Sequence, residues 1–314
     1  MEFLSYLISG ICLGSVYAII ALGYTMVYGI AKMLNFAHGD VIMIGGYISF
    51  CGFAYMGLNG WVSLLLAMVV CTVLGILIEG LAYKPLRQAT SLAVLITAIG
   101  VSYLLQNSAL LIWGATPKVY APLIPLVGPD GAPNALRLFD GQLSISYMSI
   151  VTMAACVIIM ALLTWFTSRT KLGKAMRACS ENKAAAQLMG INVNRTISMT
   201  FAIGSALAAI AGVLLCSFNP TLMPTTGSMP GIRAFTAAVF GGIGSIPGAV
   251  IGAFLIGIME NIIKGLDVIL FKSGVITKPL GLATFSDAFT FALLIIILVV
   301  KPTGLFGEAA TDKV

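Results

Sequence analysis

Three polar residues that follow the first long apolar stretch could carry chemistry: Asn35, His38 and Asp40. His38 is the only histidine of the chain, and a metal site needs three or four ligands, so these residues do not predict a metal centre. Catalysis by His38 with Asp40 would need a nucleophile motif nearby, and the sequence offers none. Two interpretations stay open: side chains that cap the start of a helix, or polar groups that line a cavity.

A glycine-rich segment at residues 241–248, GGIGSIPG, is the second candidate. A dinucleotide-binding G-x-G-x-x-G loop would need a glycine where Pro247 stands and a strand before it, so this kind of site is excluded. Gly241, Gly242, Gly244 and Pro247 instead interrupt an apolar helix. Such a break either lines a passage or is a plain packing kink.

The remaining candidates for a cofactor are weak. Six cysteines occur, five of them inside apolar runs and none in a C-x-x-C pair, so we expect them to pack as small apolar side chains. The only Gly-Lys pair, Gly173-Lys174, is followed by Ala175, which excludes the phosphate loop G-x-x-x-x-G-K-[ST]. We therefore expect no metal, nucleotide or other cofactor on this chain, and no enzymatic activity.

The elements that hold these residues must suit lipid. Of 314 residues, 59% are hydrophobic and 9% charged, and the mean hydropathy is +1.04. Soluble proteins carry about 25% charged residues. A membrane span needs about 20 apolar residues. Uncharged stretches occupy residues 3–31, 41–78, 88–117, 143–166, 196–232, 234–259 and 288–300.

These stretches predict an all-α integral membrane protein, a single transmembrane domain over residues 1–314. Residues 41–78 suffice for two spans with a turn at 57–60, which gives about eight spans, or nine if 234–263 is split at its glycines and proline. The runs are continuous rather than alternating, which argues against strands. The start lacks a basic region, so the first stretch is expected to be a retained span.

Basic residues predict the orientation. Six of the 17 Lys and Arg residues lie in a loop at 167–197, and Lys84, Arg87 and Lys301 mark two further basic segments. The positive-inside tendency places all three segments in the cytoplasm and the loop at 118–142 outside. The N-terminus is outside if the first three segments all cross, and inside if the second is re-entrant or broken. Topology accounts for the net charge of +6, so nucleic acid is not an expected partner.

Several residues are expected to hold the helices together. Gln106 and Asn107 are neutral polar residues in an apolar stretch and can hydrogen-bond between helices. Glu79 and Glu260 lie near the ends of their stretches, where an interfacial position costs little. Small residues at a spacing of four allow helix backbones to approach closely in lipid. These are Gly10, Gly14 and Ala18; Gly204, Ala208 and Gly212; and Ser245, Ala249, Ala253 and Gly257.

Within the loop 167–197, residues 181–189 predict a short helix. Ser180 is a suitable N-cap, Glu181 suits the positive helix N-terminus, and Gly190 stands at the usual terminating position. The helix is only about 14 Å long and cannot cross a bilayer. It lies on the lipid surface, or it docks an apolar face into a groove of a soluble partner. That face would consist of Ala184, Ala185, Leu188 and Met189.

Four patches carry a family resemblance. They are GYTMVYG at 23–29, NFAHGD at 35–40, RACSENKAAAQLMGIN at 177–192 and AFTAAVFGGIGSIPGA at 234–249. The third is similar to the EAA-type coupling loop of bacterial ABC importer permeases. Together, in this order and over nearly the whole chain, the patches resemble the high-affinity branched-chain amino acid permeases of that class.

The resemblance implies a multi-pass permease subunit in the bacterial cytoplasmic (inner) membrane that moves leucine, isoleucine or valine by alternating access. It implies a second, homologous permease as partner, two ATPase subunits that bind ATP and Mg²⁺, and a periplasmic or extracellular substrate-binding protein. Two alternatives stay open: transport of urea or short amides within the same family, and a gradient-driven secondary transporter or channel. The charge-free centres of the spans argue against the second.

Two sets of site residues follow. The resemblance implies that the ATPase contact consists of Arg177, Ala178, Ser180, Glu181, Asn182, Ala186, Leu188, Met189 and Gly190. Intramembrane polarity and the glycine break assign the translocation path to Asn35, His38, Asp40, Gln106, Asn107, Gly241, Gly242, Gly244 and Pro247.

Overall fold

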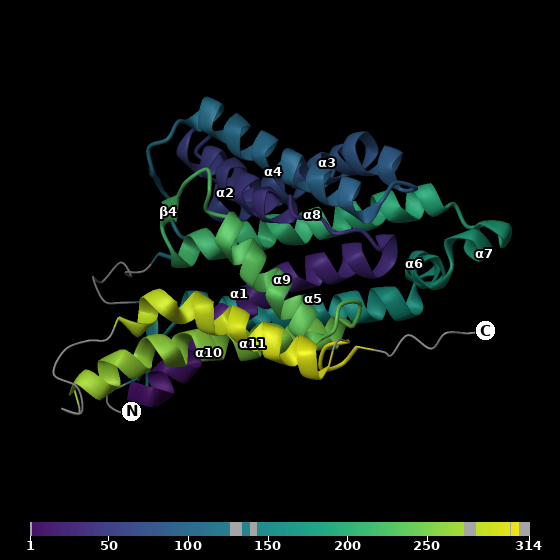
Figure 1. Cartoon of the computed structure of the whole chain (residues 1–314). Coiled ribbons are helices and arrows are strands. Elements are labelled where there is room, and N and C mark those ends of the chain that lie inside the picture. The colour runs from purple at the N-terminus through teal and green to yellow at the C-terminus, as the bar shows by residue number, and fades with distance from the viewer. Residues whose placement is uncertain (1, 126–133, 139–142, 273–280, 302, 308–314) are drawn as a thin grey trace.

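Apolar segments in lipid fold into helices because a helix satisfies its own backbone hydrogen bonds, which lipid cannot do. Figure 1 shows the computed structural model of the chain, which describes residues 2–125, 134–138, 143–272, 281–301 and 303–307. The helices are α1 (Glu2–Ala31), α2 (His38–Ala54), α3 (Gly60–Ile78), α4 (Ser91–Trp113), α5 (Tyr147–Arg169), α6 (Lys171–Glu181), α7 (Lys183–Leu188), α8 (Val193–Phe218), α9 (Ser228–Gly241), α10 (Ile246–Lys272) and α11 (Ser286–Val300).

Short elements join the helices. A π-helical turn (Glu79–Tyr83) and a 3₁₀ turn (Lys84–Leu86) continue α3, and a second 3₁₀ turn (Leu282–Phe285) precedes α11. Two small antiparallel ladders lie between helices. One pairs β1 (Lys118–Val119) with β4 (Thr221–Leu222), and the other pairs β2 (Ala135–Leu138) with β3 (Leu143–Ser146).

The helices differ in length, and this decides which can cross a membrane alone. Within the described residues, six are long and apolar enough: α1, α3 with its extension, α4, α5, α8 and α10. Helices α2, α9 and α11 have 17, 14 and 15 residues, which is short of about 30 Å of hydrocarbon at 1.5 Å per residue. The predicted all-helical class, the turn before α3 and the split between α9 and α10 are confirmed. The predicted eight or nine spans thus comprise full-length and shorter helices.

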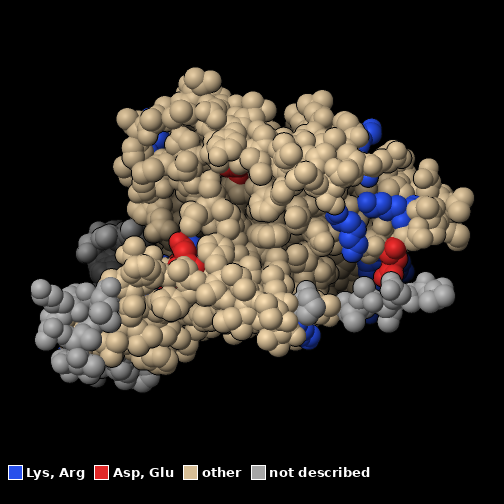
Figure 2. Space-filling model, viewed as in Figure 1, with Lys and Arg blue, Asp and Glu red and all other residues tan. Residues whose placement is uncertain are grey.

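The N-terminus and the basic loop lie at opposite ends of the bundle. Lys183 of α7 donates from Nζ to the carbonyl oxygen of Ala31, the last residue of α1, at 2.7 Å. Figure 1 shows the N-terminus at one end and α6 and α7 at the other, and Figure 2 shows Lys and Arg gathered at the α6–α7 end. The positive-inside tendency assigns that end to the cytoplasm. We therefore expect the N-terminus to lie outside.

Helix α2 begins inside the bundle rather than at its end. The imidazole of His38 lies against Gly23 of α1, so close that a Cβ on Gly23 would be 2.4 Å from Nε2. Gly23 is eight residues before the cytoplasmic end of α1, which is a depth of about 12 Å. Residues 32–37 thus return into the bundle before α2 starts. The second apolar segment thus begins with a break before α2, as the broken-segment alternative required. Helix α2 nevertheless continues to the outer end of the bundle.

Close backbone contacts hold the core, as the small-residue stripes predict. A Cβ added to Gly257 of α10 would lie 2.4 Å from the backbone nitrogen of Gly14 in α1. A Cβ on Gly212 of α8 would lie 2.2 Å from the carbonyl oxygen of Ile42 in α2. Helix α8 is the most enclosed span: 78% of its apolar window is buried, against 17% for α4 and for α5. The bundle is therefore built around α8, and α4 and α5 lie at its periphery.

Two acidic residues predicted to lie near the interface are buried within the protein. Glu79 and Glu260 are each 1% exposed. Glu260 accepts from Tyr17 at 2.9 Å, from Arg233 at 2.8 Å and from Lys264 at 2.5 Å. The interfacial position of both residues stays a prediction, because burial within the protein does not give their depth in a bilayer. A buried carboxylate is tolerated here since basic partners surround it.

Replacing Gly257 by alanine tests the α1–α10 contact. Because the new Cβ would meet the backbone of Gly14, the two helices must separate, and we expect a loss of about 1–3 kcal/mol in unfolding free energy. Thermal unfolding of the detergent-solubilised protein measures it. Gly100→Ala is the matched control, since a Cβ at Gly100 meets nothing within 4 Å and alanine favours the helix. Equal midpoints for the two variants would contradict this packing.

Candidate functional site

The cytoplasmic loop folds into two helices, each with its own cap. Thr170 caps α6 by accepting from the backbone N–H of Gly173 at 3.0 Å. Asn182 has extended backbone angles and caps α7 by accepting from the N–H of Ala185 at 3.0 Å. These are ordinary N-cap interactions, and they fix the corner between α6 and α7.

The predicted start of the short helix is wrong by two residues. Ser180 does not cap it; its hydroxyl donates to the carbonyl oxygen of Arg177 at 2.7 Å, inside α6. Glu181 is the last residue of α6. Met176 and Cys179 are buried, so packing extends α6 past Ser180 and leaves Asn182 as the break. The predicted end is confirmed, because Gly190 has a φ of +82° and its N–H bonds the carbonyl oxygen of Gln187.

The tip of α7 exposes large apolar side chains. Leu188 is 89% and Met189 82% exposed, whereas Ala186 on the opposite side is buried. Figure 1 shows α7 at the extreme end of the molecule, beyond the ends of the long helices. An exposed apolar pair that lies beyond the bundle is a candidate contact for a soluble partner.

The tip is tied to the bundle. Beside the hydrogen bond from Lys183 to Ala31, Ala186 packs inward. Burial lowers the pKa of Lys183, and the nearby charge of Arg87 lowers it further. A lysine that is partly buried and bonded to a helix end holds α7 in one position relative to α1.

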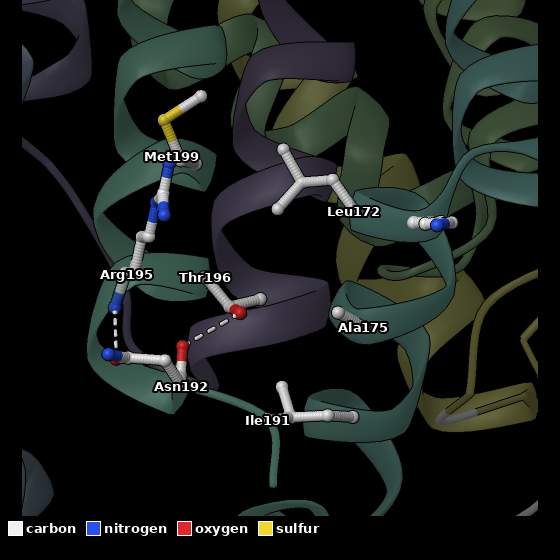
Figure 3. A pocket seen from close by; sticks show the side chains of 8 residues that line it. Leu172, Ala175, Ile191, Asn192, Arg195, Thr196 and Met199 are labelled. Carbon is white, nitrogen blue, oxygen red and sulfur yellow. Dashed lines mark hydrogen bonds between the residues drawn. The ribbon is translucent and has the colours of Figure 1, made fainter.

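Two hollows flank the loop. The first, of about 390 Å³, lies between α6 and α8. Figure 3 shows Leu172, Ala175 and Ile191 on one side of it and Thr196 and Met199 of α8 on the other. The second, of about 520 Å³, adjoins α7 and is lined by Arg87, Gln88, Lys183, Gln187, Gly190, Ile191, Asn192, Val193, Asn194 and Ile197. The first has a mainly apolar wall, whereas the second is lined mostly by polar side chains, and both contain basic residues.

A buried ion pair, which sequence reasoning missed, lies beside the second hollow. Arg87 bonds both Glu79 of the π-helical turn and Asn194 of α8. Glu79 also accepts from Ser198 of α8 at 2.5 Å. The only signal in the sequence was an acid and a base eight residues apart at the end of an apolar stretch. These contacts fasten the cytoplasmic end of α3 to the start of α8.

A second polar site lies inside the bundle, where the first residues of α2 and α9 meet. A Cβ on Gly227, just before α9, would lie 1.8 Å from the carbonyl oxygen of Gly39. Asp40, in the first turn of α2, accepts from Nε2 of Gln106 in α4 at 2.9 Å. Gln106 also lies 3.3 Å from Oγ of Ser102 and 3.2 Å from Oγ of Ser228. We call Asp40, Ser102, Gln106 and Ser228 the polar cluster.

The polar cluster joins two predicted path residues, Asp40 and Gln106, and adds Ser102 and Ser228, which sequence reasoning missed. Ser102 and Gln106 are four residues apart and so share one face of α4. Ser228 could not be found in this way, because it approaches from another helix. Ser102, Gln106 and Ser228 are partly exposed, whereas Asp40 is 2% exposed.

Other predicted path residues lie elsewhere. Asn35 is buried and accepts from the hydroxyl of Tyr83 at 2.9 Å. The ring of His38 lies against that of Tyr24 in a tilted arrangement, with ring centres 4.6 Å apart, and His38 Nε2 has no hydrogen-bond partner among the described residues. Asn107 is exposed and donates to the carbonyl oxygen of Tyr103 in its own helix at 2.7 Å. No side chain caps α2, whose N-cap residue is Ala37, so the capping interpretation is wrong.

The glycine break forms the turn between α9 and α10. Gly242 and Gly244 have φ of +103° and +105°, which other residues rarely adopt. The backbone N–H groups of Leu305 and Phe306 bond the carbonyl oxygens of Phe240 and Gly241 at 2.9 and 3.0 Å. Gly241 stands about 20 Å along α9 from Ser228. The residues Gly241, Gly242, Gly244 and Pro247 are therefore at the other end of α9 from the polar cluster.

Comparison with known proteins assigns the family. The family model described as "Branched-chain amino acid transport system / permease component" matches residues 6–298. The chain is 42% identical to the high-affinity branched-chain amino acid transport system permease protein BraD of Pseudomonas aeruginosa, over 100% of this chain and 98% of that protein. It is also 42% identical to LivH of Escherichia coli K12, with the same coverage. A probable LivH of Methanocaldococcus jannaschii is 30% identical over 92% of this chain and 88% of its own length. The chain therefore belongs to the family of branched-chain amino acid transport system permease components.

Proposed function

We propose that this chain is the permease subunit of an ATP-driven importer of branched-chain amino acids. The observation that carries the proposal is the exposed apolar tip of α7, Leu188 and Met189, held rigidly at the basic end of a membrane bundle. The relatives that match over the full chain are named as permeases of branched-chain amino acid transport. Their names support leucine, isoleucine and valine as substrates over urea or short amides.

In this proposal the tip is the coupling contact. One of two ATPase subunits, which bind ATP and Mg²⁺, receives Leu188 and Met189 in a groove, by helix-in-groove recognition. The second hollow, beside α7, leaves room for a side chain of that partner. A tip that projects past the long helices suits a soluble partner better than a flat position on lipid headgroups.

The contacts of the loop give a route for the motion. A displacement of α7 acts on the end of α1 through Lys183. The same loop adjoins α8, whose first residues are fastened to the end of α3 by Arg87 and Glu79. Helices α1, α3 and α8 then move together, and the bundle alternates between outward and inward access with a second, homologous permease. A substrate-binding protein delivers the amino acid from outside.

The polar cluster is the part of the translocation path that this proposal supports best. Polar groups at the depth of a bilayer centre face a cavity or another protein rather than lipid. Ser102, Gln106 and Ser228 are partly exposed on this chain. They therefore suit a passage between this permease and its partner. A gradient-driven transporter would share such a cluster but would have no use for the apolar tip.

Charging the tip tests the coupling contact. The double variant Leu188→Asp, Met189→Asp is expected to reduce co-purification of the ATPase subunits and ATP-driven leucine uptake at least about tenfold, because both side chains lose their apolar contact. Lys174→Asp, at an exposed position of α6 that lines neither hollow, is the control and should change both by less than about twofold. Normal uptake and normal ATPase binding by the double variant would exclude this contact.

Removing the Lys183 ammonium tests the tie between tip and bundle. Lys183→Met loses a hydrogen bond of about 1.5–3 kcal/mol while keeping the aliphatic stem. We expect the ATPase subunits to co-purify as before, with leucine uptake per ATP hydrolysed reduced about three- to tenfold. Lys174→Met, at an exposed lysine of α6, is the matched control. If the two variants have the same uptake-to-hydrolysis ratio, Lys183 does not transmit the motion.

A further inference from the structure

The buried acids of the described residues differ in one respect. Asp40, Glu79 and Glu260 are the buried acidic side chains, at 2%, 1% and 1% exposure. Glu79 has an ion pair with Arg87, and Glu260 has ion pairs with Arg233 and Lys264. Asp40 has none with any described residue; its side-chain partner is the neutral amide of Gln106. Asp40 is thus the one buried acid here without a base.

Hydrogen bonds orient the Asp40 carboxylate without neutralising it. Gln106 Nε2 donates to Oδ1 at 2.9 Å and lies near the hydroxyls of Ser102 and Ser228. Residues of three helices, α2, α4 and α9, therefore meet around the amide of Gln106. A buried charge that lacks a partner of opposite sign is normally eliminated or paired. This one is held in a defined geometry, and no base among the described residues pairs with it.

The site is reached from outside the chain. Ser102, Gln106 and Ser228 remain partly exposed around the buried Asp40. Aromatic side chains lie on the cytoplasmic side of the cluster. Phe235 is two turns further along α9 than Ser228, and its ring centre lies 5.4 Å from that of Phe36; both rings are partly exposed. This aromatic pair thus lies about 10 Å along α9 from Ser228.

We propose that the Asp40 carboxylate binds the α-ammonium group of the amino acid during its passage. Phe36 and Phe235 lie where an aliphatic side chain can pack. The inference rests on the proposed function and deepens it, since it names the substrate group that this chain recognises. A cationic amine of the substrate supplies the charge that the chain itself does not.

An isosteric neutral variant is the first test. Asp40→Asn keeps an oxygen that accepts from Gln106 but removes the charge. In the reconstituted complex with leucine-loaded binding protein, uptake of radiolabelled leucine should fall on the order of tenfold or more. ATP hydrolysis stimulated by the loaded binding protein should stay within about twofold, because the coupling loop is untouched. Gly100→Ala, on the same helix as Gln106 but with nothing within 4 Å of the added Cβ, should leave uptake unchanged.

A second pair of variants decides the question if Asp40→Asn does not assemble. Ser102→Lys places an ammonium group beside Asp40. This ammonium should pair with the Asp40 carboxylate and reduce leucine uptake at least about tenfold. Ser102→Met has a similar length without charge and should keep at least about one third of wild-type uptake.

The outcomes separate this inference from the proposed function. Wild-type uptake by Asp40→Asn, or equal uptake by Ser102→Lys and Ser102→Met, would overturn the role of the Asp40 charge while leaving the importer assignment intact. A complex that neither holds ATPase subunits nor responds to the loaded binding protein, even without substitution, would overturn the proposed function itself.

Discussion

This structure depends on one constraint: a polar or charged group that is taken out of water must find a hydrogen-bonding or ionic partner inside the protein. Buried acids are accordingly paired with bases, except Asp40, which has no basic partner among the described residues. Basic residues gather at the cytoplasmic end, and Glu79 and Glu260 are enclosed by bases from other segments. Arg233 extends the second group to Asp287 of α11 through an ion pair of 2.7 Å. These pairs fix the relative positions of helices that apolar contact alone would leave free to slide.

Close backbone approach makes the bundle rigid enough to transmit movement. Helix α1 shows the connection most directly. Its last residue, Ala31, bonds the loop lysine, and eight residues earlier Gly23 touches His38 at the start of α2. Asp40 follows two residues later. The coupling end and the polar cluster are therefore joined by one helix and one contact, without a flexible segment between them.

Sequence reasoning succeeded where a feature is local. The turn before α3, the split between α9 and α10, and the end of α7 at Gly190 follow from glycine, proline and the lengths of apolar runs. It failed where tertiary packing chooses between equivalent local options. Ser180 and Asn182 are both good capping residues, and only the burial of Cys179 decides that α6 continues past the first. Neither Ser102 nor Ser228 stood out in the sequence. Their proximity depends on the packing of α4 and α9, and the contacting residues Gln106 and Ser228 are 122 residues apart in the chain.

The short helices explain how an unpaired acid can exist at such a depth. A full-length span at the place of α2 or α9 would cover the centre of the bundle with apolar side chains. Because both helices begin inside, their first residues and the loops before them bring polar groups to that depth while neighbouring helices cover the backbone. Glu79 and Glu260 are satisfied permanently and so serve the fold. Asp40 is oriented by a hydrogen bond but has no basic partner among the described residues. Binding of a cation would therefore lower the free energy of an ionised Asp40 carboxylate. That difference separates a residue that holds the bundle together from one that can take part in transport.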